Sequence, residues 1–239
     1  MGACRHSAGR AGAERRFYGA GYPVRSMAGT RTRLDIDLRR SQLVEIGMEL
    51  FAKRPYDEVS VEEIAAAAGV SRGLLYHYFP TKRDFFVEVV RAQLERLAEL
   101  TAPDTSKPPL ESLRETLDAY LDYVQENAQG YITIHRAGVG TDAEVRALLE
   151  ESYARDVERI VERITGGGEA SPLLRMAVLG WLSFTIGTVI DWLERPTIGR
   201  DELRELLVQA MKGCVGAALA VDPSLELPGI AEAEAEALP

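Results

Sequence analysis

Residues 71–82 carry several side chains that can hydrogen-bond to nucleic acid. Arg72 can donate two parallel hydrogen bonds to the edge of a guanine, the commonest specific contact between a protein and a DNA base. Further donors that can reach phosphate oxygens, and so set the position of a protein on the duplex, are Tyr76, His77, Tyr78 and Lys82. The stretch therefore predicts a surface that binds DNA.

Two short helices separated by a turn are expected to position these side chains. Ser60 and Glu63 have the spacing of a capping box, which starts one helix, and Gly69 interrupts the helical pattern that follows. Ser71 can cap a second helix. This order is typical of a helix-turn-helix, whose second helix enters the major groove with its first residues against the bases. Those first residues are Ser71, Arg72, Gly73 and Leu74.

Some of these residues also allow a purely structural interpretation. Glycine costs about 1 kcal/mol relative to alanine inside a helix, and close approach of the backbone to DNA would explain Gly73. Tyr76 or Tyr78 could instead belong to the core that Leu75 and Phe79 form. The combination of caps, turn and ring cluster favours DNA binding over packing alone.

Composition and charge exclude several other classes of protein. The 239 residues carry a net charge of −9, which argues against a general binder of polyanions. Cys4 and Cys214 are far apart and predict neither a disulfide framework nor a metal site. The chain has only three histidines, and the sequence shows no nucleophile with a nearby base and no metal motif. We therefore expect no enzyme activity, no cofactor and no metal. The uncharged run Met176 to Ile190 is shorter than a membrane span and predicts a buried helix.

Residues 38–90 resemble the N-terminal domain of the TetR family of bacterial transcriptional regulators. The matching residues are Phe51-Ala52, Val61 with Ile64-Ala65, Ala68-Gly69-Val70-Ser71, Leu75-Tyr76, Tyr78-Phe79 and Lys82. The resemblance implies an all-helical homodimer that binds DNA through this motif and carries a C-terminal effector domain. It places on the DNA side Ser60, Ser71, Arg72, Gly73, Leu74, Tyr76, His77, Tyr78 and Lys82, with Arg39 and Arg40 in support.

The remaining chain predicts further helices and no strand, so the expected fold class is all-α. The expected organisation is a disordered extension at 1–36, the DNA-binding domain at 37–84 with its motif at about 60–79, a helical effector-binding and dimerisation domain at 85–221, and a flexible acidic tail at 222–239. Residues 127–152 resemble the C-terminal domain of regulators of lipid metabolism that respond to acyl-CoA.

Two sets of residues are expected to carry dimerisation and effector binding. In the resembled family the last two helices form the dimer interface, and candidates here are Gly180, Ser183, Gly187, Trp192, Leu206, Gly213 and Ala217. Candidates for an effector pocket are Tyr120, Tyr123, Tyr131, His135, Arg136, Trp181 and Phe184. For both sets the alternative is ordinary core packing within one subunit.

The function expected from the sequence is a cytoplasmic homodimeric repressor. A small, largely apolar effector, with acyl-CoA as one form of it, would release the repressor from a pseudo-palindromic operator. One alternative is an activator or a regulator without an effector. Another is a helical carrier of lipids or small molecules with a vestigial DNA-binding region.

Overall fold

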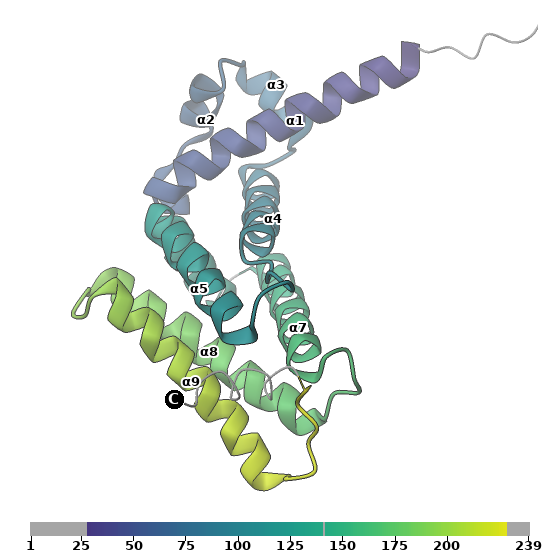
Figure 1. Ribbon diagram of the computed structural model, residues 1–239. Coiled ribbons are helices and arrows are strands. Elements are labelled where there is room, and N and C mark those ends of the chain that lie inside the picture. Colours follow the sequence, from purple (N-terminus) through teal and green to yellow (C-terminus); the bar gives the residue numbers. More distant parts are fainter. Residues whose placement is uncertain (1–27, 141, 229–239) are drawn as a thin grey trace, which may run out of the picture. The chain divides into compact units, whose positions relative to one another are not determined.

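The computed structural model describes residues 28–140 and 142–228, and within this part the chain contains α-helices, one short 3-10 helix and no strand (Figure 1). This confirms the all-α prediction. The elements are α1 (Ala28–Lys53), η1 (Tyr56–Glu58), α2 (Val61–Ala67), α3 (Arg72–Tyr78), α4 (Lys82–Leu100), α5 (Pro109–Glu126), α6 (Ala128–Gly140), α7 (Ala143–Thr165), α8 (Pro172–Glu194) and α9 (Arg200–Val221).

The chain divides into two compact units, residues 1–37 and residues 38–239. Of the extension predicted to be disordered, residues 1–27 lie outside the described part. Residues 28–36 are helical as the start of α1, so the prediction of disorder is wrong there. No proline interrupts this segment, and its arginines and leucine are good helix formers. The following description concerns the second unit.

Side-chain caps determine where the helices of the DNA-binding region begin. The Glu63 amide donates to Ser60 Oγ at 3.2 Å while Ser60 N donates to Glu63 Oε2 at 2.8 Å, so the predicted capping box is confirmed. Thr81 and Asp84 form the same reciprocal pair at the start of α4. At the start of α7 the N-cap is Asp142, whose Oδ1 accepts from two backbone amides.

A first hydrophobic core joins the DNA-binding helices to the rest of the unit. Rings from α1, α3 and α4 meet in it, with Phe79 and Phe85 at a centroid distance of 4.9 Å. A Cβ on Gly47 would lie 2.5 Å from Val89 Cγ2, so only glycine lets α1 cross α4 this closely. Residues of α6 and α7, including Leu148, complete the same core. The helices that follow the DNA-binding region therefore share its packing.

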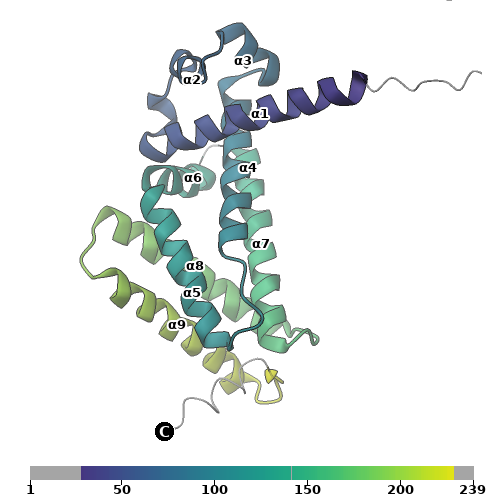
Figure 2. The same ribbon diagram turned by 45° about the horizontal axis from the view of Figure 1, so that its top comes forward.

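A second core lies among α5, α7, α8 and α9. Helices α5 and α9 are antiparallel neighbours, as Figure 2 shows, and ion pairs tie the start of α9 to the second half of α5. Arg200 and Arg204 contact the carboxylate of Asp118 at 2.7 and 3.0 Å. These contacts set the register of α9 against α5.

Helix α8 is apolar on two faces, of which the single chain buries one. By length and composition it could cross a membrane, but the core helix of a protein that does not enter a membrane passes the same test. Its buried face carries Trp181, Val189 and other core residues. Only 28% of its most apolar window is buried, and Met176 and Phe184 are 66% and 42% exposed. The prediction of a buried helix is therefore wrong for the second face.

Candidate nucleic-acid interface and ligand cavity

The turn between α2 and α3 has the geometry of a helix-turn-helix. Gly69 has φ of 62°, a left-handed conformation that glycine adopts without strain. The next amide, Val70 N, donates back to Ala65 O at 2.9 Å. Ser71 Oγ then accepts from Leu74 N at 3.2 Å and so fixes the first residue of α3. The turn and the cap together set which side of α3 faces outward.

The outward side of α3 gathers most of the residues expected to contact DNA. Leu75 and Phe79 are 3% and 2% exposed and anchor the inner side of the helix. Tyr78 is half-buried against the same core. The exposed residues are Ser71, Arg72, Gly73, Leu74, Tyr76 and His77. One short helix therefore presents a continuous polar and aromatic surface.

Arg72 is held in place by two neighbours. Its Nη1 lies 2.6 Å from Glu62 Oε1, and its guanidinium lies 5.8 Å from the centre of the Tyr76 ring. Both partners of the ion pair are more than half exposed, and such pairs contribute little to stability. Arg72 can therefore exchange Glu62 for a base edge. The sequence did not identify Glu62 as the ion-pair partner of Arg72. The only hint was the pair of acidic residues at positions 62 and 63.

Gly73 has no packing reason to be glycine. A Cβ at this position would have only Ser71 Oγ, at 3.9 Å, among its neighbours. The protein itself would accept alanine, which is the better helix former. Close approach of another molecule to the outer side of α3 would explain why position 73 has no side chain.

Other expected DNA contacts have partners inside the protein. Lys82 Nζ donates to Tyr56 O at 2.6 Å and lies 4.0 Å from the ring centre of the same tyrosine. Burial lowers the pKa of Lys82. Arg40 forms an ion pair with Glu88 at 2.8 Å, whereas Arg39 is exposed. Ser60 forms the capping box of α2, so its hydroxyl is already engaged.

A cavity of about 340 Å³ lies between α4, α5, α6, α7, α8 and α9. Four of the predicted pocket residues line it: Tyr120, Tyr131, His135 and Trp181. Two further lining residues, Ser112 and Thr185, bury hydroxyl oxygens that have no partner within the protein. Since buried polar atoms are almost always hydrogen-bonded, a bound molecule or water is expected to satisfy them.

The end of the cavity formed by α6 and α7 is lined by hydroxyl and imidazole groups that share hydrogen bonds. Tyr120 and Tyr131 share a hydrogen bond of 2.5 Å between their hydroxyls, and His135 Nδ1 lies 2.6 Å from Tyr153 Oη. Burial lowers the pKa of His135 to about 4 and raises the pKa of Tyr153 to about 12. All four groups are therefore neutral at neutral pH.

Three residues predicted for the pocket lie elsewhere. Tyr123 lines a void of about 20 Å³ beside the cavity, and its hydroxyl donates to Gln93 O at 3.4 Å. Arg136 is exposed and forms an ion pair with Glu194 at 2.5 Å. Phe184 is 42% exposed on the outer face of α8. The aromatic pattern could not distinguish the two faces of α8, because both are apolar.

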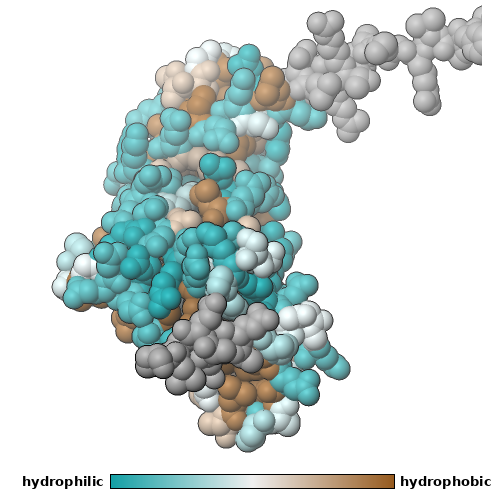
Figure 3. Space-filling view, in the orientation of Figure 1, coloured by the Kyte–Doolittle hydropathy of each residue, from teal (hydrophilic) through white to brown (hydrophobic). Residues whose placement is uncertain are grey.

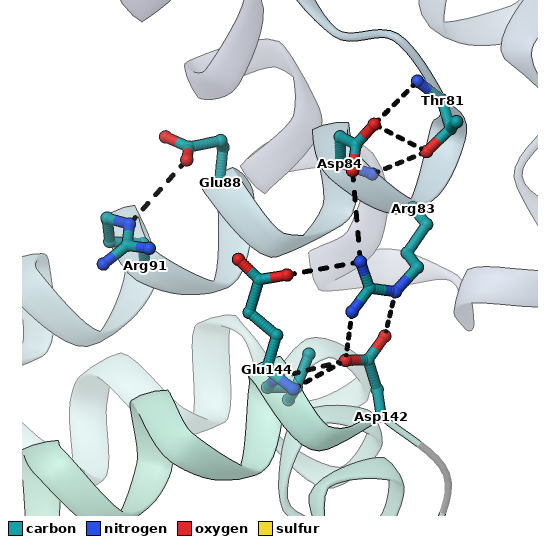
Figure 4. A network of polar contacts seen from close by, with 8 residues as sticks. Thr81, Arg83, Asp84, Glu88, Arg91, Asp142 and Glu144 are labelled. Carbon is teal, nitrogen blue, oxygen red and sulfur yellow. Dashed lines mark hydrogen bonds and ion pairs between the residues drawn. The ribbon is translucent and has the colours of Figure 1, made fainter.

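A polar network joins the start of α4 to the start of α7 (Figure 4). Arg83 donates from Nε and Nη2 to the two oxygens of Asp142 at 2.6 and 2.7 Å, and Glu144 lies 3.2 Å from Nη1. This two-pronged geometry is the stronger form of an arginine–carboxylate pair. It fixes the first turn of α4, which directly follows α3, to a helix that lines the cavity.

Most residues predicted for the dimer interface lie on exposed helix faces. The exposed ones are Gly180, Ser183, Gly187, Leu206, Gly213 and Ala217. Trp192 differs, because it is 7% exposed and its Nε1 donates to Ile198 O at 2.9 Å within the same chain. Figure 3 shows hydrophobic surface at the lower end of the view, where α8 begins and α9 ends. The described residues contain no cluster of side chains suited to hold a metal ion.

Comparisons with known proteins agree with this architecture. Residues 43–89 match the model for bacterial regulatory proteins of the tetR family, and residues 109–213 match the tetracyclin repressor-like C-terminal domain. A crystal structure of a tetR-family transcriptional regulator from Streptomyces coelicolor is similar with a TM-score of 0.73 and 30% identity. That similarity covers 78% of this chain and 84% of the other.

Curated relatives are transcriptional regulators. The activator FasR of Mycolicibacterium smegmatis is 28% identical over 182 residues, which cover 74% of this chain and 83% of FasR. The repressor KstR of Rhodococcus jostii is 24% identical over 181 residues, which cover 73% and 83% of the two chains. These relatives confirm the prediction that the protein is not an enzyme. With a helix-turn-helix followed by a helical domain of the matching type, the chain belongs to the TetR family of DNA-binding transcriptional regulators.

Proposed function

We propose that this protein is a cytoplasmic homodimeric repressor that a small, largely apolar effector releases from a pseudo-palindromic operator. The observation that carries the proposal is shared packing between cavity and DNA-binding region. Leu94 lines the cavity and also belongs to the first hydrophobic core. Tyr153 lines the cavity and packs against the same core. A ligand that moves either residue therefore disturbs the packing behind α3.

Exposed glycines support the homodimer. A Cβ on Gly180, Gly187, Gly213 or Gly216 would meet nothing within 4 Å, although each glycine lies within a helix. Each costs about 1 kcal/mol relative to alanine. Small residues let two helices approach closely, and a second copy of α8 and α9 packed on this face would explain them. It would also cover the exposed apolar face of α8.

The DNA contacts proposed for α3 follow from the exposed surface described above. Arg72 is placed against a base and Gly73 against the backbone or base edges, with Tyr76 and His77 directed at phosphates. Two copies of α3, one from each subunit, would then read half-sites about one helical turn apart, roughly 34 Å. Arg39, Arg40 and Lys82 would add charge at the margins.

Replacing Arg72 with alanine tests the base contact. The variant is expected to lose about 1–3 kcal/mol of operator binding and to accept other bases at one position of each half-site. Selection from a randomised DNA library, followed by titration of the selected duplex, measures both effects. Glu62→Gln is the matched control, because it removes the partner of Arg72 and leaves the arginine in place. Unchanged affinity and preference in Arg72→Ala would remove this residue from the interface.

A second candidate function is activation of transcription rather than repression, because the relative FasR is an activator. A promoter fusion carrying the selected operator distinguishes the two: a repressor lowers the reporter signal when the protein is present, and an activator raises it. Measuring operator affinity with and without a ligand tests whether the ligand acts as an effector. A carrier with a vestigial DNA-binding region would bind ligand while operator affinity stayed the same, and that result would refute the proposed release.

A further inference from the structure

The charges that line the cavity do not balance. Four charged side chains line it: Asp156, Arg159, Arg163 and Lys212. Three cations and one carboxylate therefore border a cavity whose other lining residues are neutral. The whole chain has the opposite balance, with a net charge of −9.

One of the three cations is fully engaged within the protein. Arg159 Nη2 donates to Asp156 Oδ1 at 2.7 Å, and Nη1 donates to Ala98 O at 2.9 Å. Burial raises the pKa of Asp156. The Asp156–Arg159 pair is therefore neutral overall, and Arg163 and Lys212 are the cations that have no carboxylate partner within the lining. Outside the lining, the carboxylates of Asp104 and Glu205 lie within electrostatic reach of Arg163 and Lys212, respectively.

Arg163 keeps unused donor capacity. Its Nη2 donates to Lys107 O at 2.6 Å, in the loop between α4 and α5, whereas its buried Nε has no partner within the protein. A guanidinium presents five N–H donors, and a buried one without an acceptor is costly. An acceptor supplied by a ligand would satisfy it.

Lys212 lies toward the same end of the cavity. Arg200 and Arg204, near the start of α9, contact Asp118 in the second half of α5. Glu205, the next residue of α9, pairs with Arg114, which lies nearer the start of α5. Because α9 thus runs antiparallel to α5, Lys212, farther along α9, lies toward the first turns of α5. Those turns follow directly on the loop that Arg163 contacts. Both of these cations therefore lie at the end away from α6.

The opposite end carries the neutral hydroxyl and imidazole groups, and between the two ends lie aliphatic side chains together with the Asp156–Arg159 pair. The lining of α5 alone runs from Pro109 to Tyr120, about 17 Å at the rise of an α-helix. Leucines and isoleucines such as Leu117 and Ile160 border this stretch. The cavity is thus elongated, with cations at one end and neutral hydroxyl and imidazole groups at the other.

We propose that the cavity binds an elongated amphiphile with one anionic head group, which Arg163 and Lys212 hold, and an apolar body directed toward Tyr120 and His135. This deepens the function proposed above by naming the class of effector and the end at which it is recognised. Arg136, one of the effector-pocket residues expected from the sequence, has no part in it, because it pairs with Glu194 outside the cavity.

Tryptophan fluorescence can test the proposal directly. The chain has two tryptophans, so Trp192→Phe leaves Trp181, which lines the cavity, as the sole reporter. The probes are dodecanoate, dodecanoyl-coenzyme A and the neutral dodecan-1-ol. At least one of the two anionic probes is expected to bind about tenfold more tightly than the alcohol, as suits a charge-assisted hydrogen bond. Tighter binding of dodecanoate would identify the recognised head group as a free carboxylate. Tighter binding of dodecanoyl-coenzyme A would identify it as the phosphates of coenzyme A.

Variants separate the two cations from general effects on the fold. Lys212→Gln, at an exposed position of α9, and Arg163→Gln are each expected to weaken the anionic probe about tenfold and to leave dodecan-1-ol unchanged. Arg175→Gln is the control, because Arg175 pairs with Glu158 and does not line the cavity. Equal binding of acid, thioester and alcohol, no quenching by any of them, or no effect of either variant would overturn the proposal.

Operator binding provides a separate readout. If an anionic probe binds as expected but leaves operator affinity unchanged, the proposed release fails while the ligand class stands. If dodecan-1-ol releases the operator as well as the anions do, the release stands and the anion-binding end is wrong.

Discussion

Replacing Gly187 with arginine is expected to give a folded monomer that binds its operator about 10²–10⁴-fold more weakly. A dimer gains avidity of this size by engaging two half-sites at once, and a monomer loses it. Gly187 lies on the exposed face of α8, where an added Cβ would meet nothing within 4 Å of its own subunit. In a close helix–helix contact between subunits, however, arginine would bury an unpaired charge and overpack the interface.

Analytical ultracentrifugation gives the oligomeric state, and titration of a duplex carrying both half-sites gives the affinity. Ala154→Arg is the matched control, since it places the same side chain at an exposed position of α7. It is expected to leave the dimer and its DNA affinity unchanged. A Gly187→Arg protein that remains dimeric would place the interface on another surface.

Replacing Phe85 with alanine is expected to lower the free energy of unfolding by about 3–5 kcal/mol, as is usual for a buried aromatic ring. Phe85 is 1% exposed, and its ring lies 4.9 Å from that of Phe79 and 6.2 Å from that of Phe51. It also lies against Gly47, where α1 crosses α4. Removing the ring would leave a cavity at the junction of three helices, which cannot close without moving α3.

Urea unfolding followed by circular dichroism measures this change. Leu74→Ala is the control for stability, because Leu74 is 39% exposed on the outward side of α3. It is expected to shift the unfolding free energy by less than about 0.5 kcal/mol, as surface substitutions usually do. A loss below about 1 kcal/mol in Phe85→Ala would mean that the first core does not depend on this ring.

Local signals in the sequence were sufficient to predict the DNA-binding region. Capping boxes at Ser60 and Thr81 and the glycine at position 69 act over three or four residues, so their geometry can be read without tertiary contacts. The spacing of Leu75 and Phe79, four residues apart with polar residues nearby, likewise indicated which side of α3 faces inward. The all-α fold and the order of most helices followed from the same kind of periodicity.

Faces and partners across the bundle needed the tertiary structure. Phe184 and Trp181 lie three residues apart on an apolar helix, yet one is exposed and the other lines the cavity. Nothing in their spacing states which side of α8 meets its own subunit. Arg136 and Arg163 pose the same problem, since each is an arginine within a helix and only Arg163 lines the cavity.

The sequence by itself therefore determined an all-helical chain with a helix-turn-helix, its caps and the outward side of its second helix, because these depend on neighbours along the chain. Only the tertiary structure decided the cavity, the cations at its end, the link between Arg83 and Asp142, and the uncovered face of α8. Each of these joins residues from different helices, and the angle and rotation at which helices pack depend on the fit of many side chains at once.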